Sequence, residues 1–189
     1  MDSTGNPLEM HAAALAEMRR VVEGMGPDQL GVATPCAEWD ARALLNHVVG
    51  GNRMAAALVA GEVPPDRNGD FLGEDPFGAF AASAEAAEAA LRGQGVLTRT
   101  FRTPFGEAPG SVLAAMRASD VLIHAWDLAR ATGQPTDLNP TLCEAALAIA
   151  RGRMAGAERK PGGPIGPEVA VPTGAPACDR YAGFMGRAV

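Results

Sequence analysis

The residues of this chain best able to do chemistry are its three histidines. His124 follows Asp120 by four residues, a spacing that places both side chains on one face of a helix, one turn apart. His47 lies on the apolar stripe of a second predicted helix, where a leucine would pack better. Because an inward carboxylate is costly unless it is paired or metal-bound, a single divalent ion would satisfy Asp120 and both imidazoles. Such a three-ligand set leaves coordination positions open for water or substrate, as catalytic zinc and related sites do.

The same residues also have simpler structural interpretations. A histidine on an apolar stripe is more often a hydrogen-bonded core residue than a metal ligand. Asp120 and His124 could equally form an ordinary pair within one helix. The third histidine, His11, lies on another predicted helix near the N-terminus. The spacing alone therefore leaves the metal hypothesis and these alternatives open.

Helices must position these residues, and the sequence marks where the helices begin. Three starts share a capping residue followed by a proline, at Asn6, Asp75 and Asn139. Asp40 is the predicted N-cap of the helix that carries His47. With the glycines that stop them, these signals predict helices over about 7–24, 41–60, 76–92, 110–131 and 140–155.

The remaining segments predict less regular structure. The stretch LTRTFRTPFG at 97–106 suggests a short strand or hairpin. From residue 156 the chain is rich in glycine and proline, which predicts an irregular surface segment, with a short helix in 179–187. We therefore predict an all-α fold, a helical bundle in a single domain over 1–189. Its core bundle spans about 7–155 and its C-terminal extension about 156–189.

Composition excludes several classes of function. The formal net charge is −6 and the Lys and Arg residues do not cluster, which argues against a nucleic-acid or membrane partner. No apolar run approaches the ~18 residues of a membrane-spanning helix, and the N-terminal stretch lacks a positive signal-peptide region. A cytoplasmic location is therefore predicted. The odd number and wide spacing of Cys36, Cys143 and Cys178 argue against a disulfide framework.

Two stretches together indicate a family. TPCAEWDARALLNHVVGG at 34–51, followed about 70 residues later by SDVLIHAWDLARATGQP at 119–135, resembles the DinB-like superfamily. Within it, the chain resembles metal-binding proteins related to the N-terminal domain of mycothiol-dependent maleylpyruvate isomerase. The resemblance covers about residues 8–155. It implies a DinB-like four-helix bundle that holds one divalent ion between its helices.

The resemblance also implies the ligands of that ion. Matched motif by motif, they would be His47, Asp120 and His124. The isomerase has a glutamate at the acidic position, and this chain has the shorter Asp120. The ion would therefore sit closer to the helix of residues 110–131, or the carboxylate would bind it through water. This departure weakens the transfer of isomerase activity more than it weakens metal binding.

The resemblance implies a divalent-metal-binding protein that acts as a metal-dependent, thiol-using transferase or isomerase of the mycothiol type. Zn²⁺ suits two imidazoles and a carboxylate best, with Ni²⁺ or Fe²⁺ as alternatives. The predicted partners are a small-molecule substrate or a low-molecular-weight thiol, with a homodimer as the assembly considered. One alternative is a non-catalytic metal-binding or stress-related protein. Another is a small-molecule-binding or cyclase-type accessory protein that uses the bundle cavity.

Some further side chains are weaker candidates. Cys36 precedes a helix N-terminus, which can stabilise a thiolate, yet it is a poor fourth ligand unless its turn folds back, and a small apolar anchor is favoured. Asp127 either orients a ligand or is a solvated or helix-pairing residue. Arg53 and Arg117 could bind an anionic substrate, but solvated arginines are favoured.

Small and aromatic residues near the predicted site have structural interpretations. Gly50 and Gly51 follow His47 closely and would leave room beside the ion for another helix or a substrate. Trp39 and Trp126 are expected in the core.

Overall fold

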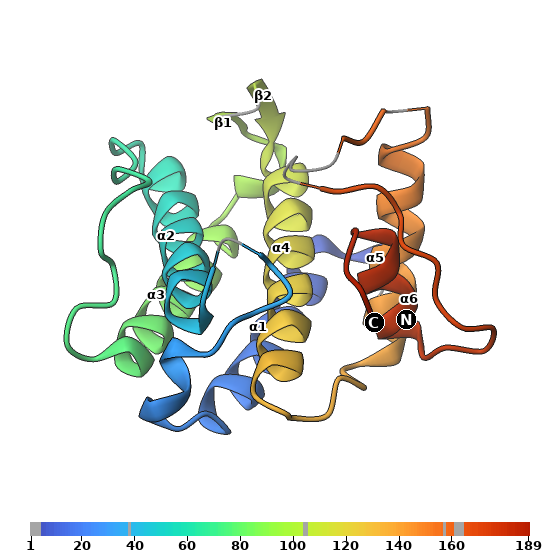
Figure 1. The fold of residues 1–189 in the computed structure, drawn as a ribbon. Helices are drawn as coiled ribbons and strands as arrows, with labels where there is room; N and C mark the ends of the chain where they lie inside the picture. The colour runs from blue at the N-terminus through green and yellow to red at the C-terminus, as the bar shows by residue number, and fades with distance from the viewer. Residues whose placement is uncertain (1–4, 38, 104–105, 157, 161–164) are drawn as a thin grey trace.

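The computed structural model describes residues 5–37, 39–103, 106–156, 158–160 and 165–189. These residues form a mostly helical fold with one short hairpin (Figure 1). The helices are α1 (Pro7–Glu23), α2 (Ala41–Ala60), α3 (Pro76–Leu91), α4 (Gly110–Ala131), α5 (Pro140–Arg153) and α6 (Ala177–Phe184). Two short 3₁₀ helices, η2 (Pro27–Gly31) and η3 (Val96–Thr98), and the strands β1 (Thr100–Thr103) and β2 (Gly106–Pro109) complete it.

The helices begin where the local sequence predicts. The Asn6 side chain accepts a hydrogen bond from the first turn of α1, and Asp75 does the same for α3. Asn139 caps α5 in the same way, and Asp40 caps α2. Each cap satisfies a backbone N–H that the helix itself leaves without a partner. At the other end of α2, Gly61 adopts the left-handed conformation, with φ of 76°, that favours glycine.

Helix α4 is the central element of the bundle. It packs against α1, α2 and α6, with α3 packed on α2 and α1, and α5 packed on α6 (Figure 1). Every residue from 121 to 129 is buried, so the second half of α4 is surrounded by protein on all sides. This run includes His124 and Asp127, which are therefore polar groups in the interior.

The predicted hairpin and short terminal helix are both confirmed. Strands β1 and β2 pair in an antiparallel register that sets Thr100 opposite Pro109 and Thr103 opposite Gly106. The residues that join the strands, 104–105, lie outside the described part of the chain. Helix α6 overlaps the stretch 179–187 where a short helix was expected, and begins two residues before it. The assignment of all 189 residues to one domain stays a prediction.

The cysteines differ from the sequence prediction. Cys143 of α5 and Cys178 of α6 form a disulfide, and Cys36 is the free cysteine. The argument against a disulfide framework is therefore wrong for this pair. The two cysteines are 35 residues apart in sequence, and only the packing of α6 on α5 brings them together. The bond ties α6 and the segment after it to the bundle.

None of the described helices combines the length and the apolar character that crossing a bilayer requires. The cytoplasmic location stays a prediction.

Candidate metal centre

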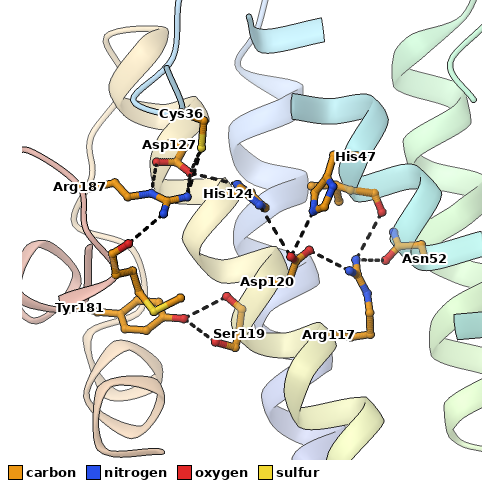
Figure 2. A network of polar contacts seen from close by, with 12 residues as sticks. Cys36, His47, Asn52, Arg117, Ser119, Asp120, His124, Asp127, Tyr181 and Arg187 are labelled. Carbon is orange, nitrogen blue, oxygen red and sulfur yellow. Dashed lines mark hydrogen bonds and ion pairs between the residues drawn. The ribbon is translucent and has the colours of Figure 1, made fainter. Parts of the chain in front are cut away.

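The three predicted metal ligands come together between α2 and α4. His47 Nε2 lies 3.2 Å from Asp120 Oδ1, and His124 Nε2 lies 3.7 Å from the same oxygen. One ligand atom from each residue can be chosen so that all three lie within 4.8 Å of one another. Figure 2 shows both imidazoles pointing toward the Asp120 carboxylate. We refer to His47, Asp120 and His124 as the open group.

The dimensions of the open group suit a small divalent ion. Bonds of about 2.0–2.2 Å in tetrahedral geometry separate neighbouring ligand atoms by roughly 3.3–3.6 Å. The two distances to Asp120 Oδ1 are 3.2 and 3.7 Å. Small side-chain adjustments would therefore let His47, Asp120 and His124 hold an ion. Their role as ligands remains a prediction.

Arg117 orients the Asp120 carboxylate and stabilises its ionised form. Its Nη1 donates to Asp120 Oδ2 at 2.8 Å, one turn away on α4. Burial alone would raise the pKa of Asp120, but the positive charge of Arg117 and the hydrogen bond with His47 outweigh it and hold that pKa well below its usual range. Asp120 is therefore ionised at neutral pH, with Oδ1 directed at both histidines.

The expectation that Arg117 is solvated is wrong, because its side chain is only 6% exposed. Besides Asp120, its guanidinium donates to Asn52 Oδ1 at 2.9 Å and to Val48 O at 3.3 Å, both on α2. Gly51 creates the space for it, since a Cβ at that position would lie 2.3 Å from Arg117 Nη1. The neighbours on α2 are more than 60 residues away in sequence, so the chain pattern around Arg117 does not reveal them.

The other small and aromatic residues near the open group have distinct places. Gly50 makes room for Phe71, whose ring would lie 2.5 Å from a Cβ at position 50. Gly50 and Gly51 therefore make room for the side chains of Phe71 and Arg117, and both also line a cavity. Arg53 is exposed, as expected, and donates to the Phe71 carbonyl. Trp39 is half-buried, with its ring centroid 4.7 Å from that of His47. Trp126 is fully in the core, as expected.

A cavity with a volume of about 160 Å³ adjoins the open group. Its lining includes His47 and Asp120 of the open group, together with Arg117, Met54 and Arg67. The volume exceeds that of a single water, about 30 Å³, and lies below that of a typical drug-sized pocket. The cavity therefore suits a small molecule or part of a larger one beside the predicted ion.

Asp127 holds the other side of His124. Its carboxylate is completely buried, and its Oδ2 lies 3.0 Å from His124 Nδ1. An ionised carboxylate can only accept, so Nδ1 carries the hydrogen and the lone pair of Nε2 faces the open group. Burial raises the pKa of Asp127, but its hydrogen bonds with His124 and Arg187 outweigh this and lower it below the usual range. Asp127 is therefore not solvated: it pairs with His124 within α4 and fixes the orientation of that ring, and whether the ring is a metal ligand stays a prediction.

Arg187, in the segment after α6, was not identified from the sequence. Its Nε donates to Asp127 Oδ1 at 3.1 Å and its Nη2 to Oδ2 at 2.9 Å, so it binds both carboxylate oxygens (Figure 2). Such two-point binding is the strongest geometry an arginine offers a carboxylate. No local signal marks this pair, because 60 residues separate the two side chains.

Cys36 joins the same cluster because its turn folds back. A bridge between Ala33 and Asp40 reverses the chain, and Cys36 Sγ lies 3.2 Å from Asp127 Oδ2. Burial and the negative charge of Asp127 raise the pKa of Cys36 to about 12. The helix N-terminus therefore does not activate this thiol. Cys36, His124 and Asp127 also offer three ligand atoms within 4.8 Å of one another, and we refer to them as the closed group.

His11 lies apart from both groups. It is 1% exposed on α1, and its Nε2 is buried with no hydrogen-bond partner in the described structure. Burial, with the nearby charges of Arg117 and Arg92, lowers the pKa of His11 to about 4. His11 is therefore a neutral core residue at physiological pH.

Comparisons with known proteins support the fold described above. Two solved structures, of the mycothiol-dependent maleylpyruvate isomerase and of a mutant of it, share the fold, with TM-scores of 0.63 and 0.60. Each match covers 76% of this chain and 68% of the other, at 19% and 20% identity, so the likeness concerns the fold alone.

Closer relatives in sequence carry no assigned activity. Uncharacterised proteins from two strains of Mycobacterium tuberculosis are each 40% identical to this chain over 184 residues, covering 97% of it and 99% of the relative. The family model described as the mycothiol maleylpyruvate isomerase N-terminal domain matches residues 11–129. These residues include all of the open and closed groups. The chain therefore belongs to the mycothiol maleylpyruvate isomerase N-terminal domain family.

Proposed function

We propose that this protein binds one divalent ion at the open group and uses it in a thiol-dependent transfer or isomerisation. The observation that carries the proposal is the convergence of both Nε2 atoms on Asp120 Oδ1, beside a cavity of about 160 Å³. Two imidazoles and one carboxylate favour Zn²⁺, with Ni²⁺ or Fe²⁺ as alternatives. When bound, the ion would supply Lewis-acid chemistry, lowering the pKa of a thiol or water or polarising a carbonyl.

The chain's own residues prepare the ligands for this role. Arg117 takes Asp120 Oδ2 and leaves Oδ1 for the ion. Asp127 accepts a hydrogen bond from Nδ1 of His124, which leaves the lone pair of Nε2 for the ion. Trp39 lies beside both imidazoles, with ring centroids 4.7 and 5.9 Å away, and limits how far they can swing.

The thiol in this proposal comes from outside the protein. Cys36, with a pKa of about 12, is protonated at neutral pH and is therefore a weak nucleophile. The described residues that line the cavity include no cysteine. The solved isomerase that shares this fold is named as mycothiol-dependent. A low-molecular-weight thiol such as mycothiol is therefore the co-substrate that we propose.

One observation favours a second candidate, a non-catalytic metal-binding protein. His47 belongs to α2 and the other two ligands to α4, so an ion would join two helices of the bundle. In that role, the ion would stabilise the fold and only water would fill its open positions.

Metal analysis of the purified protein tests the metal-binding part. We expect one equivalent of a divalent ion in the wild type and none in His47→Ala. The control His11→Gln removes a histidine outside both groups and should keep the full equivalent. If His47→Ala retains its ion, the open group is not the site.

Turnover assays test the reaction. The protein should catalyse transfer or isomerisation only with both an ion and a low-molecular-weight thiol present. An ion that binds without any thiol-dependent turnover would favour the structural role, and the metal-binding part of the proposal would stand.

A further inference from the structure

We propose that Arg187 occupies a second cation site, the closed group, and thereby directs a divalent ion to the open group. The second half of the inference, that the ion is directed to the open group, rests on the proposed function. Its first half, that a guanidinium fills the place of a metal, depends on the closed group alone.

The guanidinium of Arg187 has the contacts of a bound cation. Besides its two hydrogen bonds to the Asp127 carboxylate, its Nη2 donates to Cys36 Sγ at 3.1 Å. The Arg187 side chain is only 11% exposed, and Asp127 is completely buried. Arg187 therefore contacts two of the three members of the closed group and balances the buried negative charge.

Without that guanidinium, the closed group has the donors of a transition-metal site. A sulfur, an imidazole nitrogen and a carboxylate oxygen lie within 4.8 Å of one another on Cys36, His124 and Asp127. Thiolate and imidazole donors suit Zn²⁺ and Cd²⁺. With Arg187 in place, a divalent ion there would meet a positive charge at contact distance in a poorly solvated environment. The arginine and a metal ion therefore exclude each other.

His124 belongs to both groups, so the group that binds a cation decides which nitrogen of His124 can bind the ion. In the closed group it would bind an ion through Nδ1, the atom that now faces Asp127 at 3.0 Å. A neutral imidazole that binds metal through Nδ1 carries its hydrogen on Nε2, which then has no lone pair for the open group. By keeping the closed group filled, Arg187 keeps Nε2 of His124 available to the open group.

The segment that carries Arg187 is anchored at several points. Cys178 of α6 is bonded to Cys143 of α5. Tyr181 of α6 donates to the carbonyl of Ser119 on α4 at 3.0 Å. These anchors hold the segment after α6 against α4, where Arg187 reaches Asp127 (Figure 2).

Titration with Cd²⁺ tests the inference, read as the ultraviolet charge-transfer band of a cadmium–thiolate bond. We expect the band in Arg187→Gln and not in the wild type. It should disappear in Arg187→Gln with Cys36→Ser. Formation of the bond replaces the Cys36 thiol hydrogen by Cd²⁺, and the proton leaves to solvent. Arg180→Gln is the matched control, since Arg180 is an arginine of α6 that contacts Glu144 and the Ala175 carbonyl and neither group.

Thermal unfolding gives a second readout. Cd²⁺ should raise the melting temperature of Arg187→Gln more than that of Arg180→Gln, because it replaces a cation that the first variant has lost. A variant that shows neither the band nor the larger shift would overturn the inference. If Arg187→Gln does not fold, Arg187→Lys replaces it: that variant keeps the charge and should give no band, and a band in it would overturn the inference.

Failure of the proposed function gives a different pattern. The closed group does not include His47, so the band should also form when Arg187→Gln is combined with His47→Ala. A wild type that binds no ion would refute the proposed function, and a thiolate band in Arg187→Gln would still support the second cation site. A wild type that binds one ion, with neither the band nor the larger thermal shift in Arg187→Gln, would refute only the inference.

Discussion

Asp120 and Asp127 lie seven residues apart on α4, and each is close to His124 and bonded to an arginine. Their surroundings are nevertheless different. The Asp120 side chain is 31% exposed, and Arg117 bonds only one of its oxygens. The Asp127 side chain is fully buried, and Arg187 bonds both of its oxygens.

This difference explains how one residue type can serve two roles on one helix. A carboxylate that keeps an accessible oxygen can bind an ion, and one whose oxygens are both occupied can only support its neighbours. The arginines differ for the same reason. Arg117 lies on the same helix as Asp120 and bonds one of its oxygens through Nη1. Arg187 comes from a distant segment and bonds both oxygens of Asp127 through Nε and Nη2.

The largest expected effect is a loss of stability when one charge of the buried Asp127–Arg187 pair is removed. Asp127→Asn leaves Arg187 buried without its partner, and we expect a loss of about 3–5 kcal/mol in the free energy of unfolding. Asp120→Asn should lose less, because Arg117 keeps its hydrogen bonds to Asn52 and the Val48 carbonyl and solvent already reaches the Asp120 side chain. Urea unfolding of the two variants measures the difference. Equal losses would mean that the two carboxylates are not structurally distinct.

Acid unfolding separates the contribution of His11 to stability from the contributions of the two aspartates. The pKa of His11 is about 4 in the folded protein, against about 6.5 when unfolded. The unfolded state therefore binds more protons between these values, and stability is lost as the pH falls through that window, by up to roughly 3 kcal/mol. Both aspartates have lowered pKa values in the folded state, so their contribution is lost only below about pH 4.

His11→Leu, with urea unfolding measured from pH 7 to pH 4, checks this assignment. The variant should show a flatter dependence of stability on pH in this window than the wild type. An unchanged slope would show that His11 does not carry the effect.

A smaller effect is expected at the support of Asp120. Gly51→Ala places a methyl group where the Arg117 guanidinium now lies, which should cost about 1–3 kcal/mol of stability through overpacking. Displacing Arg117 should also weaken metal binding, since Asp120 Oδ2 loses its partner. Gly61→Ala is unsuitable as a control because of its left-handed backbone, but Gly31→Ala has open space and should change neither property. Unaltered metal affinity in Gly51→Ala would argue against an orienting role for Arg117.

The smallest effect is expected from Cys36→Ser. A hydroxyl can donate to Asp127 and accept from Arg187 as the thiol does, so stability should change by less than about 1 kcal/mol. The content of bound metal should stay at the wild-type value. Loss of the ion in this variant would place the ion in the closed group, so that Asp127 and not Asp120 would be its ligand.

The features that could be predicted from the sequence are those with local causes. Caps at Asn6, Asp40, Asp75 and Asn139 depend on side chains within three residues of the backbone groups they bond, so the predicted helix starts agree with the structure. The pairing of Asp120 with His124 follows from the helical repeat. The place of His47 beside them came from the family resemblance together with its apolar stripe.

The set of helices and the three candidate ligands of the open group could therefore be predicted before the structure was known. Which polar groups support those ligands depends on how the helices pack. The burial of Arg117, the approach of Arg187 to Asp127 and the disulfide between Cys143 and Cys178 all join segments from 35 to more than 60 residues apart. Such contacts depend on how helices pack, and neither spacing nor composition along the chain encodes the distance between two side chains on different helices.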